Sequence, residues 1–165
     1  MSAAYTAFCA FLARWALRGA ALGLVGLVVC VQWQVTGRYL LNDTPVWTEP
    51  VALMLVLYIT ALAVAVGVRD AGHLGLESFV ALLPPAAQRG AEALIQLFVG
   101  LFAVLMALGG WEWMQLKWSE PKPILGVPEA LDYLPLLIGG ILILLFCIEQ
   151  LIALWRGENV EPAGV

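Results

Sequence analysis

The sequence predicts an all-α integral membrane protein with four transmembrane helices. Three observations lead to this fold class: an apolar composition, long stretches without charged residues, and tryptophans gathered at the ends of those stretches. Of the 165 residues, 62% are hydrophobic and 12% are charged, whereas soluble domains are about 45–50% apolar. So few charged side chains could not cover that much apolar surface in a soluble domain of this length.

Uncharged stretches locate the membrane spans. Three stretches of nineteen residues carry no charge: 19–37, 50–68 and 93–111. A helix of that length rises about 28 Å, close to the ~30 Å hydrocarbon core of a bilayer. A fourth run of sixteen residues ends at Glu149, and apolar residues continue beyond it to Trp155. We therefore expect one membrane domain over residues 1–165, with spans at approximately 19–37, 48–68, 92–113 and 133–155.

The seven tryptophans support these spans independently. An indole ring prefers the headgroup level of a bilayer, where its apolar body is buried and its N–H is hydrated. Each one lies at or near the end of an expected span: Trp15, Trp33, Trp47, Trp111, Trp113, Trp118 and Trp155. A soluble helical bundle gives no reason for this distribution.

The arginines and lysines of the connections predict the orientation. One side of the membrane, with both termini and the connection between the second and third spans, holds Arg14, Arg18, Arg69, Arg89 and Arg156. The other side holds Arg38, Lys117 and Lys122. This asymmetry favours both termini in the cytoplasm. The first span has no convincing cleavage site, so we expect it to remain as an anchor.

The connection between the second and third spans predicts a short amphipathic helix lying in the membrane interface. Its apolar residues follow the spacing of one helical face, and its ionisable residues gather on another: Leu76, Phe79, Val80 and Leu83 against Asp70, His73 and Glu77. The uncharged residues 3–13 are a second candidate for an interfacial helix. Three prolines within 117–128 predict an ordered extended loop on the outer side.

The chain lacks the residues that enzymatic and cofactor chemistry needs. Its single histidine, His73, excludes a bis-histidine haem. The three cysteines, Cys9, Cys30 and Cys147, have no metal-binding spacing. The sequence also shows no nucleophile–base constellation and no phosphate-binding glycine loop. We therefore expect no cofactor and no enzymatic activity, and the net charge of -4 predicts no nucleic-acid partner.

The positions of the ionisable residues argue against a self-sufficient pump. A transporter needs ionisable groups near the bilayer midplane, and the three nineteen-residue spans have none. Glu49, Glu112 and Glu149 lie near helix ends, where water or a snorkelling partner can satisfy them. Small residues instead predict close helix packing, at Gly19/Gly23, Ala61/Ala65, Ala63/Gly67 and Gly139-Gly140.

A series of short motifs runs from the end of the first span past the second: Arg38-Tyr39, Asn42, Trp47-Thr48-Glu49, Arg69 with His73, and Leu74-Gly75-Leu76-Glu77. Their order and spacing resemble the small, Q-type membrane subunit of the tripartite ATP-independent periplasmic (TRAP) transporters. In that family an arginine–aromatic pair closes the first span, a W-x-E-E motif begins the second, and R-x-x-x-H follows it. Pro50 stands where the family usually has a second glutamate, which puts any contact of that carboxylate in doubt.

The resemblance implies a non-catalytic subunit in the bacterial inner membrane. Its partners would be a large multi-span permease subunit, a periplasmic substrate-binding protein and membrane lipids. The large subunit would carry the sodium and substrate sites and take up a small, carboxylated solute, while the small subunit braces it. The residues expected to contact partners are Arg38, Trp47, Glu49, Arg69 and His73.

Individual roles follow as hypotheses. Arg38 would pair with Glu49 or Asp43, and Arg69 would snorkel to anionic headgroups. In the alternative interpretation, these side chains only set the depth of the helices in the membrane.

Two other classes of protein stay open at this point. A stand-alone small four-helix transporter would need an acidic residue in its first span, and residues 19–37 contain none. A membrane anchor of a respiratory or redox complex would hold quinone or haem. The missing histidine pairs argue against haem, but quinone contacts leave no reliable sequence pattern.

Overall fold

The computed structural model describes residues 3–43, 45–70 and 84–156, and in these segments the prediction of an all-α fold is confirmed. Four helices are long and apolar enough to cross a membrane: α1 (Ala3–Thr36), α2 (Thr48–Asp70), α4 (Pro85–Leu116) and α5 (Leu134–Arg156). A π-helical turn, η1 (Gly37–Leu41), extends α1, and a short 3-10 helix, η2 (Glu129–Asp132), precedes α5. The interfacial helix expected between α2 and α4 lies outside the described residues.

Helix α1 begins well before the first expected span. Residues 3–13, which we considered as a separate interfacial helix, are continuous with the rest of α1. No glycine or proline occurs between Ala3 and Arg18, so nothing in the backbone ends the helix there. Arg14 and Arg18 therefore interrupt the apolar sequence without interrupting the helix. Helix α4 likewise begins ahead of its expected span, at Pro85, a residue suited to a first helical turn.

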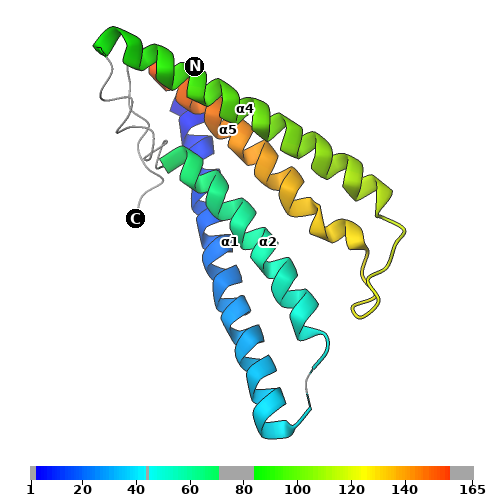
Figure 1. The fold of residues 1–165 in the computed structure, drawn as a ribbon. Helices are drawn as coiled ribbons and strands as arrows, with labels where there is room; N and C mark the ends of the chain where they lie inside the picture. Colours follow the sequence, from blue (N-terminus) through cyan, green and yellow to red (C-terminus); the bar gives the residue numbers. More distant parts are fainter. Residues whose placement is uncertain (1–2, 44, 71–83, 157–165) are drawn as a thin grey trace.

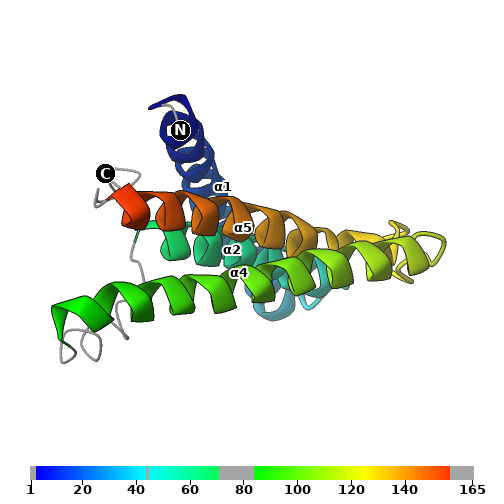
Figure 2. The same ribbon diagram turned by 90° about the horizontal axis from the view of Figure 1, so that it is seen from above.

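The four helices form an open layer (Figure 1). Helix α5 lies between α2 and α4, and α1 packs mainly on α2. Within the described part of the chain, α1 and α4 do not contact each other. The α1–α2 pair and the α4–α5 pair converge at the end that carries the N-terminus and diverge toward the opposite end. Seen from above, α1 crosses the other helices obliquely (Figure 2).

Glycines allow the close helix contacts that hold this layer. A Cβ atom on Gly139 would lie 3.2 Å from the Cβ of Ala61 in α2, whereas one on Gly140 would lie 2.8 Å from the backbone oxygen of Ala103 in α4. The two adjacent glycines therefore face different neighbours. A Cβ on Gly23 would likewise meet Ile59 at 2.8 Å. By contrast, a Cβ on Gly67 would have no atom of the described residues within 4 Å.

A structured loop joins α4 to α5, as the prolines predicted. Lys122 pairs with Asp132 at 2.6 Å, and the ring of Tyr133 stacks on Trp113 with centroids 5.7 Å apart. Lys117 donates a hydrogen bond to Glu120, which raises the pKa of Lys117 and lowers the pKa of Glu120 from their ordinary values. Ion pairs thus fold this loop against itself.

Candidate functional site

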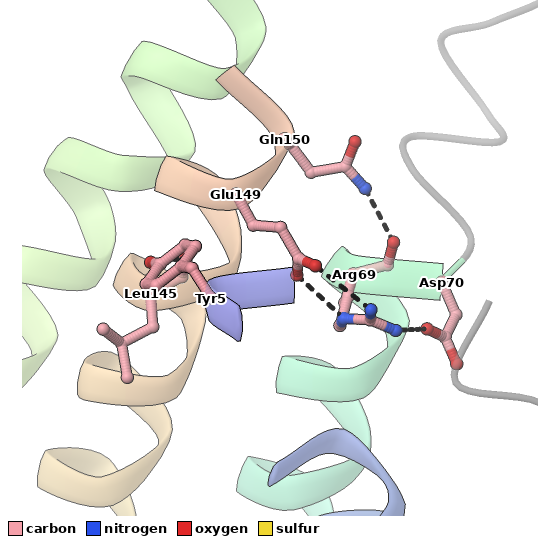
Figure 3. Close-up of polar contacts among 6 residues, drawn as sticks. All are labelled: Tyr5, Arg69, Asp70, Leu145, Glu149 and Gln150. Carbon is pink, nitrogen blue, oxygen red and sulfur yellow. Dashed lines mark hydrogen bonds and ion pairs between the residues drawn. The ribbon is translucent and has the colours of Figure 1, made fainter. Parts of the chain in front are cut away.

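The end of the layer where the helices converge contains a buried ion pair between α2 and α5 (Figure 3). Arg69 lies in the last turn of α2, and Glu149 lies in the second half of α5. The Nε of Arg69 donates to Oε2 of Glu149 at 2.9 Å, and its Nη2 donates to Oε1 at 3.2 Å. This two-point arrangement matches the planar fork of a guanidinium to the two oxygens of a carboxylate.

Both partners of this pair are removed from solvent. Arg69 is 3% exposed and Glu149 is 1% exposed. The ring of Phe146, which is completely buried, lies 5.9 Å from the guanidinium carbon of Arg69. Two isolated charges in such surroundings would carry a large desolvation cost, so each depends on the other for compensation.

Further hydrogen bonds surround the ion pair (Figure 3). Nη1 of Arg69 donates to Asp70 at 3.0 Å, and the amide of Gln150 donates to the backbone oxygen of Arg69 at 2.7 Å. The second bond satisfies a carbonyl in the last turn of α2, which has no partner within its own helix. From α1, the hydroxyl of Tyr5 donates to the backbone oxygen of Leu145 at 2.9 Å. Three helices are therefore joined by polar contacts at one end of the layer.

This geometry corrects one sequence-based expectation and decides between the alternatives of another. Arg69 does not snorkel toward headgroups, because its side chain is buried against Glu149. Of the two alternatives for Glu149, water or a partner side chain, the structure shows the partner, which is Arg69. One signal in the sequence pointed toward such a site: a carboxylate inside an apolar run needs a partner. It did not identify Arg69 among the available arginines, because the two residues are 80 positions apart.

Three other predicted site residues lie at the far end of the α1–α2 pair. Arg38, Trp47 and Glu49 are all exposed. The guanidinium of Arg38 lies 5.8 Å from the ring of its neighbour Tyr39. Among the residues that the structure describes, Arg38 forms no ion pair, so the expected pairing with Glu49 or Asp43 is wrong.

The predicted site residues therefore do not form a single site. Arg69 is buried at the convergent end, whereas the other three described residues are exposed at the divergent end. His73 lies outside the described residues. Pro50, as expected, falls in the first turn of α2. The described segments contain no group of three histidine, cysteine or acidic residues that could hold a metal ion.

Another buried polar side chain was missed in the sequence. Gln96 of α4 is 7% exposed, and its Oε1 atom has no hydrogen-bond partner within the described segments. The glycine contacts place Gly100 of α4 beside Cys147 of α5. Because α4 and α5 are antiparallel, Gln96 lies about one turn further toward the end that carries Glu149.

Four membrane-length helices, two of which are joined by a buried ion pair, define a multi-pass helical membrane protein. Residues 27–157 match the family described as tripartite ATP-independent periplasmic transporters, DctQ component, and the chain belongs to this family. It is therefore a TRAP small permease subunit of the inner membrane and not an enzyme. This membership sets aside the redox anchor and the stand-alone transporter.

Two relatives match over most of their lengths. A TRAP transporter small permease protein of Haemophilus influenzae is 27% identical over 141 residues, which cover 83% of this chain and 86% of the relative. The sialic acid TRAP transporter small permease protein SiaQ of Vibrio cholerae is 23% identical over 138 residues, which cover 81% of this chain and 77% of the relative.

Proposed function

We propose that this chain braces a large permease subunit during sodium-coupled, binding-protein-dependent uptake of a small carboxylated solute. The observation that carries the bracing role is the Arg69–Glu149 pair. It is buried, fixed by two hydrogen bonds, and joins the two helix pairs at one end. Such a contact suits a rigid frame, because neither charge can leave the other without an uncompensated desolvation cost.

The buried polar groups of the described segments support a scaffold role better than a transport role. Those groups are Thr48, Arg69, Gln96 and Glu149. The two charged members bind each other. A transported ion or solute would need charged groups turned toward its path. By this proposal the large subunit supplies such groups.

Two kinds of contact with partners follow from the positions of the predicted site residues. Arg38, Trp47 and Glu49 are exposed and can touch a partner directly. Arg69 is buried, so its effect on assembly is transmitted through the relative positions of α2 and α5. With both termini in the cytoplasm, the three exposed residues would lie on the periplasmic side, where the binding protein docks.

The solute class and the sodium coupling rest on likeness to other proteins. The name of the Vibrio cholerae relative refers to sialic acid, which is a carboxylated sugar. We extend only the carboxylate to the solute of this system. Sodium coupling follows from the resemblance to the TRAP family.

Copurification tests the assignment of partners. The tagged chain is extracted from its native membrane in a mild detergent, and the accompanying proteins are identified by mass spectrometry. We expect a polytopic protein with roughly a dozen spans. A flavoprotein or a cytochrome in its place would contradict the proposal.

Reconstitution tests the division of labour. Liposomes that contain both permease subunits should accumulate the solute only with the loaded binding protein outside and an inward sodium gradient. A potassium gradient is the matched control. Liposomes with this chain alone should accumulate nothing, and accumulation against a gradient there would overturn the bracing role.

A further inference from the structure

The N-terminal part of α1 has an exposed face that combines large aromatic residues with arginines. We propose that this face binds anionic phospholipids through their phosphate headgroups. The face consists of Phe8, Phe11, Arg14, Trp15 and Arg18.

Sequence spacing and packing place these residues on one side of α1. Phe8, Phe11 and Trp15 follow helical spacing and are 51%, 51% and 56% exposed. The Phe11 and Trp15 rings meet edge to face, with centroids 6.1 Å apart. The small residues Cys9, Ala13 and Ala16 are buried on the other side of the helix. The aromatic side is therefore the one that the subunit leaves uncovered.

Helix length places this face at the membrane surface. The 34 residues of α1 rise about 51 Å, whereas the bilayer measures about 40–45 Å including its headgroup regions. An upright α1 would push its aromatic end into water. A tilted α1 keeps that end at headgroup depth, and α1 is oblique to the other helices (Figure 2). Phenylalanine and tryptophan side chains are stabilised at that depth.

The charges of this face call for an external anion. Arg14 and Arg18 are exposed and one helical turn apart. Neither is in an ion pair within the described part of the chain, whereas Arg69, Lys117 and Lys122 each bind a carboxylate. The guanidinium of Arg18 lies 5.4 Å from the Trp15 ring centre. This contact holds a cation at the depth of the indole ring, where lipid phosphates lie.

An anionic lipid explains both halves of the face. Its acyl chains would cover the phenylalanine rings, and its headgroup would neutralise the arginines. Each basic residue near an anionic membrane surface strengthens binding to that surface about fivefold relative to a neutral one. Two arginines together should therefore favour an anionic lipid over a zwitterionic one by more than tenfold at low salt.

Competitive lipid binding tests the proposal. The full chain in a neutral detergent is equilibrated with equal amounts of phosphatidylglycerol and phosphatidylcholine, and the retained lipids are counted by native mass spectrometry. We expect the wild type to retain phosphatidylglycerol preferentially. The double variant R14Q/R18Q should lose most of this preference, and R14K/R18K should keep most of it because the charge remains.

Lys122→Gln provides the control, because Lys122 lies in the loop between α4 and α5 and already pairs with Asp132. We expect K122Q to retain the wild-type preference. The proposal is overturned if the wild type shows no preference, if R14Q/R18Q keeps it, or if K122Q loses as much. It is also overturned if R14Q/R18Q loses the large subunit in copurification while its lipid preference is unchanged, since that result would assign the face to a protein partner.

Discussion

Arg69 and Glu149 meet in two hydrogen bonds although 80 residues separate them in the sequence. The pair connects the end of α2 to α5 (Figure 3), at the end where the two helix pairs converge (Figure 1). At the other end of the layer the same helix pairs diverge (Figure 1). The contact therefore fixes the arrangement of the subunit at the point where its two halves join.

Removing one charge of this pair should destabilise the protein strongly. We expect Arg69→Met to lower the free energy of unfolding by about 3–5 kcal/mol, because Glu149 would remain buried without the counter-charge that Arg69 supplies. The double variant R69M/E149L should recover much of that loss. Denaturant titration in detergent micelles measures these energies.

The partly exposed pair of Lys122 and Asp132 supplies the control for that experiment. Lys122→Gln should cost no more than about 1 kcal/mol. If Arg69→Met were equally mild, the buried carboxylate of Glu149 would not depend on Arg69.

Adding a methyl group at Gly140 should separate α4 from α5. Its Cβ would lie 2.8 Å from the backbone of both Ala103 and Ala107, and backbone atoms cannot move aside cheaply. We expect Gly140→Ala to destabilise the protein by about 1–3 kcal/mol. Gly67→Ala is the matched control, because no atom of the described segments would touch the added methyl group. It should be neutral or stabilising by up to about 1 kcal/mol. Equal effects of the two changes would refute the close contact.

Replacing Gln96 should be tolerated or favourable. Its side-chain oxygen is buried without a partner in the described segments, and an unsatisfied buried acceptor costs about 1–3 kcal/mol. We expect Gln96→Met to keep or raise the free energy of unfolding. Gln150→Met should lower it, because Gln150 donates to the backbone of Arg69. A large loss for Gln96→Met would mean that its oxygen is satisfied by a group outside the described segments.

The loop between α4 and α5 should respond to acid through Glu120. Its pKa is lowered by Lys117, so its contribution to stability is present above the ordinary carboxylate pKa and is lost as the pH falls through the lowered value. Thermal unfolding of the wild type and of Glu120→Gln should therefore differ slightly at pH 7 and converge below about pH 4. A difference that grows with acid would contradict this sign.

Exposed residues at the divergent end should matter for assembly and not for folding. We expect Trp47→Ala and Glu49→Gln to reduce the yield of copurified large subunit several-fold, because direct contacts would be lost. Their helix content and unfolding midpoints should stay near those of the wild type, since both side chains are exposed. If both variants recover the large subunit in full, the predicted contacts are wrong. These residues would then serve only to set the depth of the helices in the membrane.

Much of the fold was predictable because the bilayer imposes it. A span must be about twenty apolar residues long and must satisfy its own backbone, so uncharged stretches located all four helices. The ends of α1 and α4 were less predictable, since a charged residue marks a membrane boundary without ending a helix. The contact faces at Gly23, Gly139 and Gly140 were anticipated, but Gly67, which matches the same spacing, makes no such close approach to another described residue.

The sequence by itself determined the class of protein, the number of spans and the family motifs, because composition, spacing and order are properties of a chain read locally. Only the tertiary structure decided that Arg69 binds Glu149, that Arg38 binds neither expected carboxylate, and that adjacent glycines of α5 face different helices. Ion pairs and close contacts depend on which helix faces are turned toward each other. That orientation is set by the packing of all four helices together, and no single segment encodes it.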